Sequence, residues 1–435
     1  MSEKPPVPRL IVETREVPHI EDPLLFASRP WPIAWQRRGD MLVGAGGDVL
    51  RIEVDGPDRL ARIAESWRRV MESAEVDDAV ALPGTGLVAF GAFAFDESSA
   101  SPSTLVVPST IIGRRGGRSW ITRVRGAADA DWAPDPVADE YGAHWSATLG
   151  PGRMDPEAHG DAVRHALAAI EAGEVGKVVV AREITGTVPA GADLRRLVRA
   201  LASGYPDTWT FSVEGIIGAS PETLVTVHGG DVTARVLAGT RPRGADADED
   251  TAIIAELAVN PKDVDEHEYA VRSVVDALRP HTSALAAAEA PFTLKLPNLW
   301  HLATDVEGTL TNGSSALDMV RALHPTAAVA GTPTEAALAL IRRIEPFDRG
   351  RYAGPVGWID GNGDGEWAIA LRCAQFGTPG APAAPGDGDD ARHRDPDGTR
   401  AVTAHAGGGI VAGSVPEAEL LETRVKFRPI VDALN

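Results

Sequence analysis

The sequence predicts an α+β fold, in which large, mixed or mainly antiparallel sheets are covered by helices. Of the 435 residues, 43% are apolar and 24% are charged, which is typical of a globular protein with a sizeable core. The strand-like segments follow one another as hairpins more often than they alternate with helices, which favours antiparallel pairing. No internal repeat of fixed period is found.

The formal net charge of -20 argues against nucleic acid and anionic lipid as partners, because a field of that sign repels both. An anionic substrate would need local cations or a metal ion. No apolar run reaches the roughly 18 residues that span a bilayer, and MSEKPPVPRL lacks the apolar core of a signal peptide. Cys373 is the single cysteine, so an intramolecular disulfide is impossible. We therefore expect a cytoplasmic protein, a monomer with no obligate protein partner.

Residues 1–10 are expected to form a flexible tail, and residues 11–150 the N-terminal part of the fold. One amphipathic helix is expected at RLARIAESWRRVMES, and a buried strand at residues 86–96. The cluster Gly44–Gly47 suggests a dinucleotide-binding turn, but Val49 stands where the third glycine would be, and a strand-like segment follows instead of a helix. A hairpin turn is the interpretation that we retain.

Residues 151–435 are expected to form the catalytic region, after a connecting stretch at 126–152. The first helix begins after Asp155, a good N-cap, and continues to about Ala172. The further elements expected are a strand that begins with Lys177; helices at 192–203, 249–258, 263–279, 315–323, 334–343 and from Pro416; strands within 208–230, 299–310, 354–376 and 401–411; and a disordered loop rich in Pro, Gly and Asp at 378–400.

Two of the expected helices carry pairs of acidic residues three positions apart. Asp263 and Glu266 share one helix face, and Glu419 and Glu422 share another. If the two faces met across a cleft, they would offer hard oxygen ligands suited to Mg²⁺. Solvated helix faces are the simpler interpretation of each pair taken alone, with Lys426 as an i, i+4 partner of Glu422.

Four other features could contribute to a site. Lys177 begins a buried strand and either reaches water or is held in a pocket as a base. Arg372, flanked by alanines on its strand face, lies at a sheet rim or binds a carboxylate. Glu222 follows a proline at the end of an apolar strand, either as an ordinary turn residue or as a general acid. The glycine-rich segments LAGT (237–240) and AGGGIV (406–411) form tight turns or present backbone amides to a ligand.

Taken together and in this order, these segments resemble the chorismate-utilising enzymes, and among them the isochorismate synthases. The segments that carry the resemblance, which spans about residues 155–430, are KVVVAR, GASPETL, LAGT, KDVDEHEY, LWHLATDVEG, LHPTAAVAGTP, EPFDRGRYAGPVGW, LRCA, AGGGIV and ETRVK. The resemblance implies an α/β sandwich with two large, mainly antiparallel sheets. It also implies Mg²⁺-dependent, reversible conversion of chorismate to isochorismate, in which water attacks C2 and the C4 hydroxyl leaves.

The resemblance also implies a role for each candidate residue. Lys177 would be the general base that activates water, and Glu222 the general acid. Glu266 and Glu422 would bind Mg²⁺, with Asp263 and Glu419 holding it directly or through water. Substrate contacts would come from the amides of Gly239, Thr240 and Gly408 or its neighbours, from Arg372 and Lys426 at the pyruvyl carboxylate, and from His301 and Ala328 along the pocket.

Two positions separate the related activities. Aminodeoxychorismate-forming relatives carry a lysine where this chain has Ala238, and anthranilate synthases usually lack the lysine at position 177. Lys177 together with Ala238 therefore implies that water is the nucleophile. Salicylate synthases share both residues and then eliminate pyruvate, so that activity stays as an alternative, and an anthranilate-type component as a more distant one. The product would feed menaquinone, catechol siderophore or salicylate synthesis.

Overall fold

The computed structural model describes residues 8–295, 299–311, 313–377 and 398–435. Within these ranges all the helices predicted from the sequence are confirmed. They are α1 (Arg59–Ser73), α2 (Pro156–Glu171), α3 (Arg195–Gly204), α4 (Ala247–Val259), α5 (Pro261–Leu278), α6 (Ala316–Leu323), α7 (Thr334–Ile344) and α8 (Pro416–Leu434), with short 3-10 turns at Pro23–Phe26 and Arg279–His281. None of the described helices is long and apolar enough to cross a membrane.

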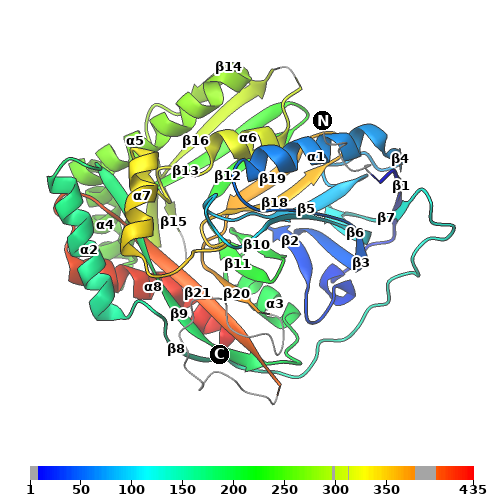
Figure 1. Ribbon diagram of the computed structural model, residues 1–435, viewed down its shortest axis with the longest axis horizontal. Coiled ribbons are helices and arrows are strands. Elements are labelled where there is room, and N and C mark those ends of the chain that lie inside the picture. The colour runs from blue at the N-terminus through cyan, green and yellow to red at the C-terminus, as the bar shows by residue number, and fades with distance from the viewer. Residues whose placement is uncertain (1–7, 296–298, 312, 378–397) are drawn as a thin grey trace.

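The N-terminal part contributes seven strands, which form one end of the sheet structure (Figure 1). They are β1 (Leu10–Val17), β2 (Ile33–Arg37), β3 (Asp40–Val54), β4 (Glu75–Asp78), β5 (Val88–Ala92), β6 (Ser103–Arg115) and β7 (Arg118–Gly126). β6 is the centre of this group, because it pairs with β3, β5 and β7. β1 pairs with β7 and, in parallel, with β4.

Two long arms of antiparallel strands diverge from β6. The first, called here the β9 arm, runs from β3 through β2, β10 (Trp209–Val213), β11 (Ile216–Ser220), β20 (Cys373–Phe376) and β21 (Thr399–Ile410) to β9 (Lys177–Pro189), with β8 (Thr148–Pro151) and β17 (Gly331–Thr332) on β9. The second, the β16 arm, runs from β5 through β18 (Pro355–Asp360), β19 (Gly365–Ile369), β12 (Thr223–His228) and β13 (Asp231–Pro242) to β16 (Leu299–Leu310), with β14 (Thr282–Ala287) and β15 (Phe292–Lys295) on β16.

Helices cover the outer faces of both arms, which confirms the α+β architecture (Figure 1). α2, α7 and α8 pack on the β9 arm, and α5 and α6 pack on the β16 arm. The largest hydrophobic cluster includes buried side chains of both arms and of the helices that cover them; Val178, Phe211 and Trp367 belong to it. Burial of this apolar surface is the main driving force that holds the arms together. A separate cluster joins α3 and α8 to the β9 arm.

Local signals place the start of β9. Asp155 caps α2 as predicted, since its carboxylate accepts hydrogen bonds from the amides of Glu157 and Ala158. Gly173, with φ of 75°, follows the C-terminal end of α2. A few residues later Lys177 begins β9, so the helix stop and the strand start are close in sequence.

Three expectations are corrected by the structure. The cluster Gly44–Gly47 forms no hairpin turn: β3 continues through it with a register shift between Ala45 and Asp48 opposite β6. The second strand expected within 354–376 is broken after Ile369 and resumes at Cys373. The connecting stretch at 126–152 ends in the short strand β8.

Two predicted segments fall largely outside the described residues. Of the expected tail at 1–10, residues 1–7 lie outside the description, and β1 begins at Leu10. Of the expected loop at 378–400, residues 378–397 lie outside it, and β21 begins at Thr399.

Candidate active site

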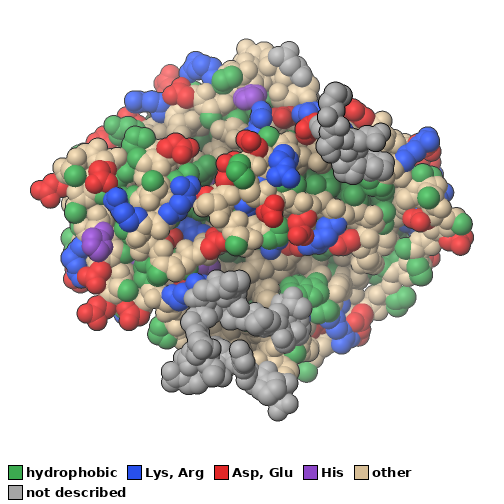
Figure 2. All heavy atoms as spheres, in the orientation of Figure 1, with side chains coloured by type: hydrophobic (Ala, Val, Ile, Leu, Met, Phe, Trp, Pro, Cys, Tyr) green, Lys and Arg blue, Asp and Glu red, His purple; other side chains and the backbone are tan. Residues whose placement is uncertain are grey.

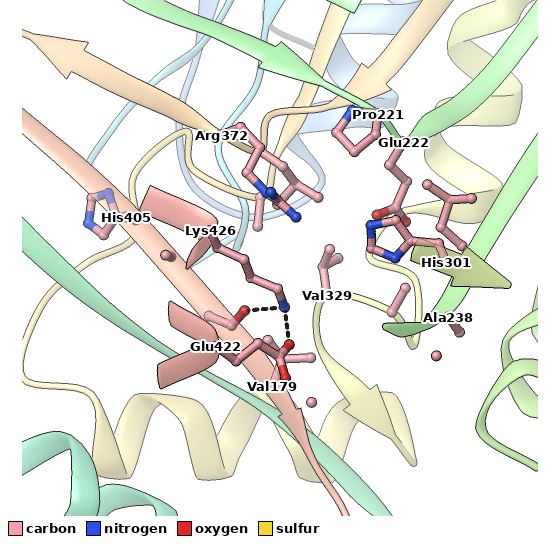
Figure 3. A pocket seen from close by; sticks show the side chains of 18 of the residues that line it. Val179, Pro221, Glu222, Ala238, His301, Val329, Arg372, His405, Glu422 and Lys426 are labelled. Carbon is pink, nitrogen blue, oxygen red and sulfur yellow. Dashed lines mark hydrogen bonds and ion pairs between the residues drawn. The ribbon is translucent and has the colours of Figure 1, made fainter. Parts of the chain in front are cut away.

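A pocket lies between the two arms and collects most of the candidate residues (Figure 3). Its volume is about 130 Å³ and it opens to solvent, which leaves room for a small ligand. Of the residues predicted for the site, Lys177, Glu222, Gly239, His301, Ala328, Arg372, Lys426, Asp263, Glu419 and Glu422 line it. The side chains of Thr240 and Glu266 lie outside the described part of the structure.

Glu222 and Arg372 come from the two places where the chain passes between the arms. Glu222 connects β11 of the β9 arm to β12 of the β16 arm, and Arg372 lies between β19 and β20. The two crossings are hydrogen-bonded to their neighbours: the amide of Ile369 donates to the carbonyl oxygen of Glu222 at 3.1 Å, and the amide of Ala219 donates to that of Arg372 at 3.2 Å. This pairing places both side chains at the junction of the arms.

The break in the strand explains how Arg372 reaches the pocket. Its φ of 51° is in the left-handed region, which is unusual for a residue with a side chain. Sequence periodicity predicts that Arg372 continues the strand face of Ala368 and Ala370, but the turn ends that alternation. The guanidinium is 8% exposed, and burial lowers its pKa, while the nearby Tyr352 and Glu422 oppose that shift.

Glu222 is held in the protonated form at neutral pH more readily than an ordinary glutamate. Burial raises its pKa from 4.5 to about 7, and the positive charges of Lys177, Lys426 and Arg372 oppose the rise. All three positive charges are therefore close enough to Glu222 to influence its pKa. A carboxyl group with a pKa near 7 suits a general acid at neutral pH.

Lys177 is buried at the first position of β9, with 8% of its surface exposed. β17 pairs with this end of β9, where Thr332 is opposite Lys177 and Gly331 is opposite Val178. Gly331 has a φ of 140°, and a Cβ there would lie 2.2 Å from the carbonyl oxygen of Lys177. This close approach fixes the start of β9, and the low exposure of Lys177 contradicts the interpretation that its side chain simply reaches water.

A β-bulge shapes the wall formed by the β16 arm. The register of β13 against β16 shifts between Ala238 and Thr240, and the bulged residue Gly239 has a φ of 75°. His301, opposite Thr240, contacts the backbone of Gly239. Burial and the charges of Arg372 and Lys426 lower the pKa of His301 to about 3, so the imidazole is neutral.

The carboxylates of α8 face the glycine run of β21. A Cβ on Gly408 would lie 3.0 Å from Oε2 of Glu419 and 3.6 Å from Oε1 of Glu422, so this glycine lets the two acids approach the strand. The Nζ of Lys426 donates to the carbonyl oxygen of Gly407 at 2.8 Å and lies 2.5 Å from Oε1 of Glu422. In Figure 3 Glu422 and Lys426 lie across the pocket from Glu222 and His301.

Asp263 reaches the pocket from the first turn of α5, but Arg241 engages its carboxylate. The guanidinium of Arg241 donates to both oxygens, at 2.6 and 3.3 Å. Within the described residues, no three His, Cys, Asp or Glu side chains gather closely enough to hold a metal ion. Glu419 and Glu422 are nevertheless hard oxygen donors on one wall, which is the donor chemistry that Mg²⁺ prefers.

Among the pocket residues that were not singled out from the sequence, four have polar side chains: Arg241, Arg349, Tyr352 and His405. Arg349 and Tyr352 belong to EPFDRGRYAGPVGW, the segment in which the resemblance is strong but no role was assigned. The ring of Tyr352 stacks on His405 at 5.0 Å. Arg241 directly follows LAGT, so its place beside a glycine-rich turn was the signal that could have found it.

The net charge of -20 implies that an anionic substrate needs cations within its binding site. Acidic and basic side chains are interspersed over the face seen in Figure 2. The pocket lining includes five basic side chains, those of Lys177, Arg241, Arg349, Arg372 and Lys426, and four acidic ones, those of Glu222, Asp263, Glu419 and Glu422. A small anion would therefore find cationic partners there, although the protein is acidic as a whole.

Comparisons with known proteins identify the family of this chain. The protein family described as chorismate binding enzyme matches residues 8–435. The isochorismate synthase DhbC of Bacillus subtilis is 34% identical over 399 residues, which cover 88% of this chain and 88% of the relative.

Solved structures are similar over almost the whole chain. DhbC of Bacillus anthracis superposes with a TM-score of 0.73 at 30% identity, covering 94% of this chain and 98% of that one. The menaquinone-specific isochorismate synthase MenF of Escherichia coli also gives a TM-score of 0.73, covering 99% and 96%. At 23% identity the MenF match shows the shared fold alone.

Proposed function

The chain belongs to the chorismate-binding enzymes, and on that premise we propose that it converts chorismate to isochorismate. Water adds at C2 of the ring and the C4 hydroxyl leaves. The observation that carries the proposal is that Lys177 and Glu222 line one pocket, while burial holds the pKa of Glu222 near 7. The names of the similar proteins, isochorismate synthases among them, support the same reaction.

The two side chains divide the proton transfers between them. In the neutral form Lys177 takes a proton from the attacking water, and protonated Glu222 gives a proton to the departing hydroxyl, which leaves as water. Burial favours the uncharged form of Glu222. Lys177 comes from the β9 arm and Glu222 from the crossing to the β16 arm, so the fold itself separates base and acid.

The substrate carries two carboxylates, and the cations of the pocket offer partners for them. Arg372 and Lys426 are proposed to hold the pyruvyl carboxylate, because a guanidinium binds a carboxylate with two parallel hydrogen bonds. The bulge at Gly239 and Thr240 and the glycine run at Gly408 present backbone amides. His301, neutral because its pKa is low, and Ala328 complete the wall.

Mg²⁺ is the proposed cofactor, and Glu419 and Glu422 of α8 with Glu266 and Asp263 of α5 would hold it. The ion would supply positive charge for the ring carboxylate. The donor set fits this ion in its chemistry, because it consists of carboxylate oxygens. Arg241 and Lys426 balance Asp263 and Glu422 by hydrogen bonds in the structure as it stands.

Incubation of the purified protein with chorismate and Mg²⁺ tests the proposal. Isochorismate should accumulate with little salicylate or pyruvate. Dominant release of pyruvate would move the assignment to salicylate synthesis, and ammonia-dependent anthranilate would move it to the anthranilate-type reaction. The absence of any conversion would contradict the proposal altogether.

We further propose that the protein acts as a monomer in the cytoplasm. Its single cysteine is buried, which is consistent with a reducing compartment.

A further inference from the structure

A second, much smaller cavity lies behind Glu222, on the side away from the substrate pocket's centre. Glu222 and Ala328 line both spaces, so they form part of the partition between them. The rest of the small cavity is lined by Thr223, Leu224, Ala234, Arg235, Val236, Ala270, Val274 and Thr326. Most of these residues are apolar. Glu222 is the catalytic candidate among them.

Thr326 is the polar residue of this cavity that lacks a hydrogen-bond partner. It is 8% exposed, and its Oγ1 is fully buried with no partner among the described residues. Its backbone is satisfied, since its carbonyl oxygen accepts hydrogen bonds from the amides of Val329 and Ala330. A buried hydroxyl without a partner destabilises the folded protein, so an unpaired one calls for an explanation.

The size and polarity of the cavity suit one water molecule. Its volume is about 20 Å³, and on this measure roughly 10–15 Å³ is enough for one water with two to four polar partners. Glu222, Thr223 and Thr326 are the lining residues with side-chain oxygens. The hydroxyl of Thr223 already accepts a hydrogen bond from Nε1 of Trp209 at 2.8 Å, which leaves its own proton available.

We propose that this cavity binds a water molecule that bridges the carboxyl group of Glu222 and the hydroxyl of Thr326, and that Glu222 regains its proton through this water. The inference rests on the proposed function, in which Glu222 loses a proton to the departing hydroxyl in every turnover. Each turnover leaves Lys177 with one proton more and Glu222 with one fewer, so Lys177 must release a proton to solvent through the pocket and Glu222 must take one up. The bridging water gives one proton to the carboxylate and receives one from the solvent side, so it is unchanged overall.

Arg235 marks the direction from which that proton arrives. Its side chain lines the cavity and is 26% exposed, so the cavity extends from the buried carboxyl group toward the surface. Arg235 itself is held by Asp305, with hydrogen bonds of 2.6 and 2.8 Å. This route avoids the substrate pocket, so Glu222 can be reprotonated while substrate or product occupies the other side.

Thr326→Val and Thr326→Ser provide the test, because valine keeps the shape and removes the hydroxyl, whereas serine keeps the hydroxyl. The first readout is a high-resolution crystal structure of the whole protein, in which density for the water should lie between Glu222 and position 326 in the wild type and in Thr326→Ser. The second is rapid-mix kinetics with chorismate and Mg²⁺. In Thr326→Val the first turnover should keep its wild-type rate, and later turnovers should slow at least about tenfold, leaving a burst of one product per site.

The outcomes separate the water site from the proposed reaction. A dry cavity in the wild-type crystal structure overturns the inference, whatever the kinetics. Equal steady-state rates in Thr326→Val and Thr326→Ser, with no burst, overturn the proton route. A wild-type protein that forms no isochorismate, but contains the water, contradicts the proposed function and removes the acid role on which the route depends.

Discussion

The Nζ of Lys426 lies 2.5 Å from Oε1 of Glu422, one helical turn earlier in α8. Both residues are assigned to the site, but to different partners: the lysine to a substrate carboxylate and the glutamate to Mg²⁺. The ion pair therefore keeps a cation on Glu422 in the ligand-free protein. The pair is half-buried, with 16% of the lysine side chain and 30% of the glutamate side chain exposed.

We expect substrate and Mg²⁺ to replace this ion pair when they bind, and the variant Lys426→Met tests that expectation. Loss of the ammonium group removes one charge-assisted hydrogen bond to the substrate, which is worth about 1.5–3 kcal/mol, so KM for chorismate should rise roughly 10- to 100-fold. Mg²⁺ binding, followed by calorimetric titration without substrate, should not weaken, because the competing cation is gone. Glu422→Gln serves as the matched control and should weaken Mg²⁺ binding. Weaker Mg²⁺ binding in Lys426→Met would argue against this exchange.

Lys177→Ala is expected to abolish turnover, with a loss of at least about 100-fold in kcat, because no other group is proposed to activate water. The variant should still fold and bind Mg²⁺, as monitored by circular dichroism and calorimetric titration. Lys177→Arg keeps the positive charge but cannot become neutral near pH 7, so it should be equally inactive. Activity that survives in Lys177→Ala would show that the water is activated by another group.

The raised pKa of Glu222 predicts how both activity and stability depend on pH. Since the acid must be protonated, kcat/KM should fall as the pH rises above about 7. The folded protein retains a proton on Glu222 that the unfolded chain releases near pH 4.5, so the contribution of this group to the free energy of unfolding falls between about pH 4.5 and 7.

Glu222→Gln removes that titration while keeping a neutral, buried side chain. Chemical denaturation at about pH 5 and about pH 8 should therefore show a smaller loss of stability with rising pH in the variant than in the wild type. The variant should also be inactive, because an amide is no acid at these pH values. An identical pH dependence of stability in both proteins would show that the pKa of Glu222 is not raised.

Arg372 has a left-handed backbone conformation, and its side chain is proposed to bind the substrate. Two substitutions can separate the effect of the backbone on stability from the effect of the side chain on binding. Arg372→Ala and Arg372→Gly should both raise KM for chorismate at least tenfold, because both lose the guanidinium. Arg372→Gly should be the more stable of the two by about 0.5–1 kcal/mol, since glycine adopts the φ of 51° without strain. Thermal denaturation compares their stabilities. Equal stability would show that the turn imposes no strain.

Arg349 and Glu345 form a buried ion pair that ties three segments of the pocket together. The guanidinium donates to the carbonyl oxygens of Val179 and Val329, and the carboxylate of Glu345 accepts from the amide of Ala181 at 2.8 Å. Within the pair, NH2 of Arg349 lies 2.6 Å from Oε1 of Glu345. The pair thus joins β9, two residues after Lys177, to the turn that carries Ala328.

Arg349→Met should lower the free energy of unfolding by about 3–5 kcal/mol, because it leaves the carboxylate of Glu345 buried without its partner. The double variant Arg349→Met with Glu345→Gln should recover part of that loss. Denaturant unfolding of the single and double variants gives the coupling energy. Strictly additive losses would show that the two side chains do not stabilise each other.

Local sequence signals accounted well for the individual elements. The amphipathic pattern of RLARIAESWRRVMES predicted α1, and the cap at Asp155 with the stop at Gly173 predicted α2. The resemblance of the motifs named ten residues that line one pocket. The misses have local causes: the glycines at 44–47 form a bulge rather than a turn, and a single left-handed residue, Arg372, ends a strand that periodicity extended.

The helices, most strands and the acidic helix faces are readable from the chain, because capping and periodicity act over a few residues. The junction of the two arms is not, since Glu222 and Arg372 are 150 positions apart and come together through pairings such as that of Gly218 with Cys373. Burial at this junction, which only the packed arms create, raises the pKa of Glu222 and lowers that of His301. The candidate residues could therefore be predicted from the sequence, whereas their charge states and neighbours depend on long-range packing.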